Sequence, residues 1–154
     1  MSELFGVTLQ QTASTRDTAT FSIAVDGNNA GNVTFVKSYE PALEQIGRYV
    51  ALWAGSILCV ISRHRGAMTC IDRGDETHHV HPFENLWIIE GELQIDLFDP
   101  ASAAMLATYN HHEVITDCKL SDGLLHIRDF AGMMISLDPR HSLKVVPQES
   151  PSQE

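Results

Sequence analysis

The residues best suited to chemistry in this 154-residue chain are two histidines, His79 and His81, which are separated by one valine. In a β-strand alternate side chains point to the same face, so residues i and i+2 lie about 6–7 Å apart. Two neutral imidazoles at that distance can share one divalent ion, and Glu84 is the nearest carboxylate that could add an oxygen ligand. The spacing therefore predicts a partial metal-binding shell on one strand.

The segment around these histidines, residues 74–99, reads GDETHHVHPFENLWIIEGELQIDLFD. Gly74 is followed by four residues and then His79, and Glu84 is followed by six residues and then Gly91. This pattern resembles the first sequence motif of the cupin family, which is a glycine, a loop, His-any-His, a short spacer, a glutamate, six residues and a glycine. The run LWIIEGELQIDL is also similar to the strand–turn–strand of that family.

The resemblance covers roughly residues 55–137, because a second and weaker cupin motif follows the first. In SDGLLHI, Gly123 is followed by two residues and then His126, with Ser121 where the family usually has a proline. The resemblance therefore implies that His126 is a metal ligand together with the two histidines of the first motif.

The position of the carboxylate ligand has two interpretations. Only Pro82 and Phe83 separate His81 from Glu84, where cupins have three or four residues. Loops accept length changes more easily than paired strands do, and a shortened loop leaves Glu84 as the ligand. Glu84 and His81 have opposite parity in an unbroken strand, however, and that register places Asn85 at the ligand position.

The cupin resemblance also implies a cofactor and an activity. The cofactor is one divalent metal ion, Fe(II) first, with Zn, Ni or Mn as alternatives. The implied function is an Fe(II) dioxygenase that acts on a small chelating organic substrate. A non-redox lyase, isomerase or polyketide-cyclase-type enzyme is one alternative, and a non-catalytic small-molecule binding or sensing protein is another. Phe83 and Trp87 are candidates to line the substrate pocket, with core packing as the simpler interpretation.

The other histidines and the cysteines have simpler interpretations. Four histidines stand beside polar or turn residues and are predicted to be solvated: His64, His111, His112 and His141. Three cysteines are predicted to be small buried apolar residues: Cys59, Cys70 and Cys118. Their odd number argues against a disulfide framework and favours a reducing compartment. The sequence therefore predicts a cytoplasmic protein.

The local patterns predict a mostly β structure. Alternating apolar residues around the turn-rich segment DGNNAGN predict a β-hairpin over residues 20–37. After Pro41, four apolar residues at helical spacing predict a helix near 41–52: Leu43, Ile46, Val50 and Trp53. A strand through Tyr49, Ala51 and Trp53 is the alternative. The apolar segment 56–62 predicts a buried strand.

From residue 65 onward, turn residues alternate with short apolar runs, and the alanine-rich stretch 101–107 is expected to be a loop. Many short strands at regular spacing predict an all-β sandwich or barrel. With the resemblance, the expected fold is a cupin-type β-barrel or jelly roll with an N-terminal hairpin and one short helix. The expected domain is residues 1–147, with the barrel core at about 55–147 and a disordered tail at 148–154. We find no internal repeat.

The composition limits the partners. Apolar residues make up 44% of the chain and charged residues 19%, and the formal net charge is −10. An acidic surface repels phosphate backbones and anionic lipids, which argues against nucleic acid and membrane partners. The first residues lack the pattern of a secretory signal, and the longest apolar run is too short to span a bilayer. A small-molecule substrate remains as the expected partner, and the resemblance implies a homodimer.

Overall fold

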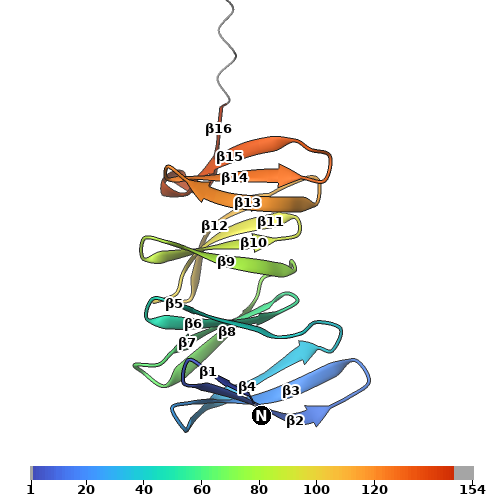
Figure 1. Cartoon of the computed structure of the whole chain (residues 1–154), viewed down its shortest axis with the longest axis vertical. Helices are drawn as coiled ribbons and strands as arrows, with labels where there is room; N and C mark the ends of the chain where they lie inside the picture. Colours follow the sequence, from blue (N-terminus) through green and yellow to red (C-terminus); the bar gives the residue numbers. More distant parts are fainter. Residues whose placement is uncertain (1, 148–154) are drawn as a thin grey trace, which may run out of the picture.

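The structure is a computed structural model that describes residues 2–147. In this range 16 strands form four antiparallel sheets of four strands each. Each sheet is built from consecutive strands, and the sheets lie on top of one another in chain order (Figure 1). We number them sheet 1 to sheet 4, from the blue sheet near the N-terminus to the red one near the C-terminus.

Sheets 1 and 2 contain the N-terminal half of the chain. Sheet 1 has four strands: β1 (Ser2–Leu4), β2 (Val7–Ser14), β3 (Thr18–Val25) and β4 (Asn28–Val36). Sheet 2 also has four: β5 (Ala42–Ile46), β6 (Tyr49–Ala54), β7 (Ile57–Ser62) and β8 (Ala67–Asp72). The hairpin predicted over residues 20–37 is confirmed by the pairing of β3 with β4.

Sheets 3 and 4 contain the C-terminal half. Sheet 3 has four strands: β9 (Thr77–Phe83), β10 (Leu86–Gly91), β11 (Gln94–Asp99) and β12 (Ala104–Asn110). Sheet 4 also has four: β13 (Ile115–Ser121), β14 (Leu124–Asp129), β15 (Met134–Asp138) and β16 (Lys144–Val146). A single turn of 3₁₀ helix, Pro139–His141, lies between β15 and β16. None of the helical structure in residues 2–147 is long and apolar enough to cross a membrane.

Three apolar layers hold the stack together, one between each pair of neighbouring sheets. Five large side chains represent them: Ile23 and Phe35 between sheets 1 and 2, Trp53 and Trp87 between sheets 2 and 3, and Ile88 between sheets 3 and 4. Because sheet 2 is covered on both faces, its central strands β6 and β7 are apolar at nearly every position rather than at alternate ones. Burial of this apolar surface is the main favourable term in folding.

The helix predicted near 41–52 is wrong, because this segment forms β5 and β6. The two strands join at Gly47, whose backbone has a positive φ of 61°. Residues 50–54 are all buried, since β6 has an apolar layer on each side. A fully apolar strand fits a helical spacing by chance, so the periodicity alone could not separate the two structures. The expected loop at 101–107 also belongs in part to a strand, β12.

The cupin-type barrel is not the observed architecture. The chain forms four separate sheets with apolar layers between them, whereas a jelly roll packs two sheets around one core. The segment that was expected to be a disordered tail, 148–154, lies outside the described residues. The extent of the single domain stays a prediction.

Candidate functional site

His79 and His81 lie on β9, and the structure confirms that their side chains share a face. Their ring centroids are 4.6 Å apart. In the pairing of β9 with β10, His79 stands opposite Glu90 and His81 stands opposite Ile88. Ile88 belongs to the apolar layer between sheets 3 and 4, so both histidines face sheet 4.

Glu84 lies elsewhere, in the turn between β9 and β10. Its backbone has a positive φ of 53°, and its side chain is exposed. The Glu84 Oε1 atom accepts hydrogen bonds from Arg140 Nε at 2.9 Å and from Arg140 Nη2 at 2.7 Å. Asn85 occupies the same turn and is also exposed. The structure brings neither of the two alternative residues into a cluster with the histidines.

His126 is also separated from the pair on β9. Its neighbours in β14, Leu125 and Ile127, point into the layer between sheets 3 and 4. Because side chains alternate along a strand, His126 lies on the outer face of sheet 4. There its Nδ1 atom lies 2.7 Å from the Ser136 Oγ atom. The metal-binding set expected from the sequence is therefore not assembled as a whole.

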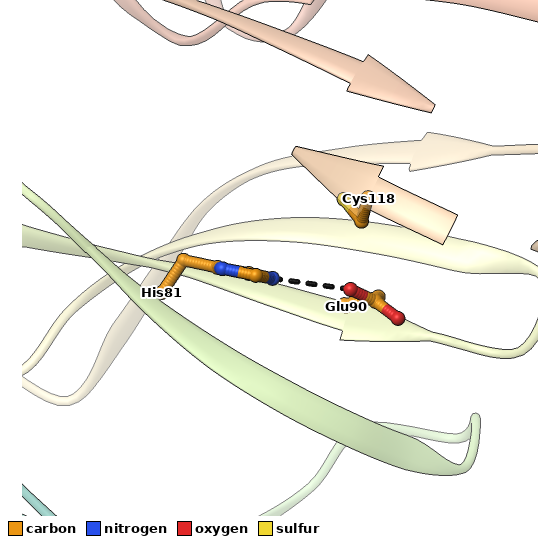
Figure 2. A group of neighbouring side chains, drawn as sticks. All are labelled: His81, Glu90 and Cys118. Carbon is orange, nitrogen blue, oxygen red and sulfur yellow. Dashed lines mark hydrogen bonds and ion pairs between the residues drawn. The ribbon is translucent and has the colours of Figure 1, made fainter. Parts of the chain in front are cut away.

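Two residues that were not predicted as ligands complete a different cluster beside His81. The His81 Nε2 atom lies 3.1 Å from the Glu90 Oε1 atom, and the Cys118 thiol of β13 lies next to both (Figure 2). The side chains of His81 and Glu90 are 18% and 14% exposed. Burial and then the Glu90 carboxylate raise the pKa of the Cys118 thiol. The cluster thus joins three strands from two sheets at the edge of an apolar layer.

A second polar cluster lies where β12 leads into β13. His111 is buried, with its Nδ1 atom 2.7 Å from the Tyr109 hydroxyl and its Nε2 atom 2.8 Å from Asp129 Oδ2. The hydrogen bond from His111 and those from the backbone hold the pKa of the Asp129 carboxyl below its ordinary value. The prediction that His111 is a solvated histidine is wrong, because both of its ring nitrogens have partners. Through the His111–Asp129 hydrogen bond, the cluster links the β12–β13 connection to the end of β14.

Phe83 and Trp87, the candidates for a substrate pocket, are buried in different layers. Phe83 packs between sheets 3 and 4, with the Arg140 guanidinium 5.3 Å from its ring centroid. Trp87 packs between sheets 2 and 3 against Tyr49 and Phe98. Phe83 of β9 pairs with Leu86 of β10, and Trp87 is the next residue along β10, so the two side chains lie on opposite faces of sheet 3 and do not share a pocket. Core packing explains both.

The connections on one side of the stack join into a continuous surface, which we call the loop edge. It consists of residues 15–17, 37–41, 55–56, 73–76, 92–93, 111–114 and 130–133. Backbone hydrogen bonds link these connections across the sheets, including Thr77 N to Gly55 O at 2.7 Å and His111 N to Leu93 O at 2.7 Å. The loop edge is therefore fixed by the backbone and presents side chains from all four sheets side by side.

The loop edge is acidic. It carries six carboxylates: Asp17, Glu40, Asp75, Glu76, Glu92 and Glu113. Three basic residues lie in its connections. Arg16 is exposed, Arg73 is buried in an ion pair with Asp96, and Lys37 donates to Ser14 and Thr15. Connections on the opposite side of the stack carry four arginines: Arg48, Arg63, Arg65 and Arg140. Three carboxylates accompany these arginines, and two of them, Asp26 and Glu84, form ion pairs with Arg63 and Arg140. The opposite side is therefore nearly balanced in charge, whereas carboxylates outnumber basic residues on the loop edge.

A cleft of about 610 Å³ opens on the loop edge between sheets 1, 2 and 3. Four carboxylates line it: Asp72, Asp75, Glu76 and Glu92. None of the described residues that line it is a lysine or an arginine. Tyr39 forms part of one wall, where its ring lies against Gly55, and a Cβ at Gly55 would be 2.9 Å from that ring. The loop edge also exposes four apolar side chains: Tyr39, Leu93, Phe130 and Met133.

Comparison with known proteins identifies the architecture. No protein-family model and no curated protein sequence matches the chain. Among solved structures, the WD40 domain of Toxoplasma gondii coronin matches with 10% identity and a TM-score of 0.53, over 85% of this chain and 40% of that one. BamB from Moraxella catarrhalis matches with 14% identity and a TM-score of 0.53, over 91% and 46% of the two chains. The Neurospora crassa Pan2 WD40 domain matches with 10% identity and a TM-score of 0.51, over 90% and 50%.

These likenesses establish the fold alone, and they correct the cupin interpretation. The chain spans half or less of the length of these solved structures. Their four-stranded antiparallel sheets, arranged as the blades of a propeller, correspond to the four sheets of this chain. The cupin family, its barrel and the iron-dependent dioxygenase expected from it, with the lyase, isomerase and cyclase alternatives, are therefore wrong. The chain has a β-propeller type of fold with four blade-like sheets.

Proposed function

We propose that the protein is a non-catalytic binding scaffold that holds a basic, partly apolar segment of another protein on its loop edge. The observation that carries this proposal is the cleft lined by Asp72, Asp75, Glu76 and Glu92 without a lysine or arginine among its described lining residues. Carboxylates gathered around a cleft focus a negative potential, which attracts cationic side chains and speeds their association.

Exposed apolar residues on the same surface add to this support. Phe130 is 78% exposed and Met133 is 53% exposed, and both lie in the connection between β14 and β15. Large aromatic and methionine side chains are enriched at protein interfaces and depleted on ordinary surfaces. A segment with arginine or lysine residues at one end and apolar residues at the other would match the cleft and this connection together.

Peptide binding tests the proposal. A fluorescent peptide with arginine residues at one end and leucine residues at the other should bind the full chain, and binding should weaken as salt is added. The Glu76→Gln/Glu92→Gln variant should bind about fivefold more weakly, because two exposed charge pairs contribute about 1 kcal/mol together. Glu84→Gln, on the opposite side of the stack, is the matched control and should bind as the unaltered protein does.

A peptide in which each arginine is replaced by glutamate should not bind. Equal binding of the two peptides, or an equal affinity of the double variant and the unaltered protein, would contradict the proposal.

Two further properties accompany the proposal as expectations from the sequence. The cytoplasmic location stays a prediction from the odd number of cysteines in the sequence. The homodimer stays a prediction that the mass of the protein in solution would test.

A further inference from the structure

We propose that His81, Glu90 and Cys118 bind a zinc ion between sheets 3 and 4, with His79 as the fourth ligand. This site is independent of the binding function proposed for the loop edge. Its residues come from three strands, β9, β10 and β13, and they converge at the edge of the apolar layer that joins the two sheets (Figure 2).

The distances suit a single small ion. One ligand atom from each of His81, Glu90 and Cys118 lies within 4.8 Å of the other two. Zinc bonds of about 2.0–2.3 Å in a tetrahedron place neighbouring ligand atoms roughly 3.3–3.8 Å apart. The His81 Nε2 and Glu90 Oε1 atoms are 3.1 Å apart, which is already close to that spacing. Side-chain rotations without movement of the sheets would therefore complete the shell.

His79 supplies the fourth ligand. It stands directly opposite Glu90 in the β9–β10 pairing, and its ring centroid is 4.6 Å from that of His81. His79 is exposed, so its ring can turn toward the ion without breaking a packed contact. Without His79 the ion would hold three protein ligands and a water molecule, an arrangement that zinc also accepts.

The donor types select zinc from the common divalent ions. Calcium and magnesium take oxygen ligands, whereas a thiolate with imidazoles favours zinc. The partly buried positions of His81 and Glu90 reduce competition from water and still leave a path for the ion. On binding, the Cys118 thiol becomes a thiolate that bonds to the metal, and its proton passes to solvent.

The second polar cluster also brings together three possible ligands, His111, His112 and Asp129, but it has no cysteine, and Asp129 already accepts a hydrogen bond from Met133 N. Both ring nitrogens of His111 already have partners, Tyr109 and Asp129, within the described structure. A metal there would have to break one of these buried hydrogen bonds, which carries a cost. At His81 the Nε2 atom lies 3.1 Å from Glu90 Oε1, and Glu90 would itself become a ligand. The site between sheets 3 and 4 is therefore the better candidate.

Metal titration of the full chain tests this proposal. After treatment with a chelator and dialysis, the protein should take up one equivalent of zinc. With cobalt(II) in place of zinc, a near-ultraviolet band of a cobalt–thiolate bond should appear. Cys118→Ser should remove this band, and His81→Ala and Glu90→Gln should weaken zinc binding at least about tenfold, since even residues that only orient ligands have effects of that size.

Three matched controls should keep the affinity of the unaltered protein. Cys70→Ser removes an exposed cysteine in sheet 2, Glu84→Gln removes the carboxylate in the β9–β10 turn, and His126→Ala removes a histidine on the outer face of sheet 4. Thermal unfolding of each metal-free variant establishes that it is folded. Zinc should raise the unfolding temperature of the unaltered protein and not that of Cys118→Ser.

Three results would overturn the proposal: no zinc uptake, a cobalt spectrum without the thiolate band, or unchanged zinc affinity in Cys118→Ser. An unchanged affinity in His79→Ala would remove His79 from the ligand set.

Discussion

The buried ion pair between Arg73 and Asp96 makes the most quantitative prediction about stability. The Arg73 Nε and Asp96 Oδ2 atoms are 2.7 Å apart, and both side chains are fully buried. Arg73 leads from sheet 2 into sheet 3, and Asp96 lies on β11. The pair thus links the connection between sheets 2 and 3 to β11 of sheet 3.

Removal of Asp96 and removal of Arg73 should have unequal costs, because the residue that is left keeps different hydrogen bonds in the two cases. Asp96 also accepts hydrogen bonds from Gln94 Nε2 at 2.8 Å and from Thr108 Oγ1 at 2.8 Å. Arg73 donates from Nη1 to Thr77 Oγ1 at 2.8 Å, and its Nη2 atom has no partner in the described structure. Loss of the aspartate charge therefore leaves a buried cation with little compensation, whereas loss of the arginine leaves a carboxylate with two neutral donors.

Asp96→Asn should consequently lower the free energy of unfolding by about 3–5 kcal/mol, the range found when one partner of a buried pair is removed. Arg73→Met should cost less than Asp96→Asn. The double variant Arg73→Met/Asp96→Asn should be more stable than Asp96→Asn alone, because it has no unpaired buried charge. Urea unfolding followed by the fluorescence of Trp53 and Trp87, both buried between sheets 2 and 3, measures all three.

A loss below about 1 kcal/mol for Asp96→Asn would refute this reasoning, since a surface charge pair contributes no more than that. An Arg73→Met variant that loses as much stability as Asp96→Asn would refute the asymmetry between the two partners, and a double variant less stable than Asp96→Asn would refute the cost assigned to the unpaired charge.

Three other predictions concern single side chains. In the folded protein Cys70 should react first with a thiol reagent, because it is exposed and its hydrogen bond with Cys59 lowers its pKa. The half-buried Cys118, whose pKa is raised, should react more slowly, and the buried Cys59 only on unfolding; mass spectrometry of alkylated peptides checks this. The pKa of Asp129 lies below its ordinary 3.8, so its charged form stabilises the folded state above that pH, and this stability is lost as the pH falls through the lowered value. Acid unfolding of Asp129→Asn should therefore depend less steeply on pH below about 4 than that of the unaltered protein. Phe130→Ser should change the unfolding free energy by less than about 0.5 kcal/mol and should weaken binding of the arginine–leucine peptide.

The sequence was sufficient to predict the all-β class and several individual strands. The hairpin at 20–37 and the buried strand at 56–62 rest on local alternation and turn residues, and both are present. The chain has no visible internal repeat, although its structure repeats a four-stranded sheet four times. Four sheets can follow the same backbone path while their turns and apolar layers are built from different residues. The structural repeat therefore leaves no repeat in the sequence.

The cupin interpretation depended on a pattern that any antiparallel hairpin can produce. His-any-His places two side chains on one face, and a glycine at the end of the next strand is common in turns. The turn at Glu84 and Asn85 reverses the chain, so the ligand-like carboxylate across from His79 is Glu90 rather than Glu84. Reading the hairpin register from that turn could have found Glu90. Cys118 could not be found in this way, because its approach to His81 depends on how sheet 4 packs on sheet 3.

A distance between two spin labels tests whether the four sheets are stacked in chain order. Thr20 of sheet 1 and Lys119 of sheet 4 belong to the two outermost sheets of the stack. Packed sheets lie about 10 Å apart, so labels at these positions, in a variant without native cysteines, should be separated by about 30 Å or more. A distance near 10–20 Å, as in two sheets packed around one core, would contradict the account.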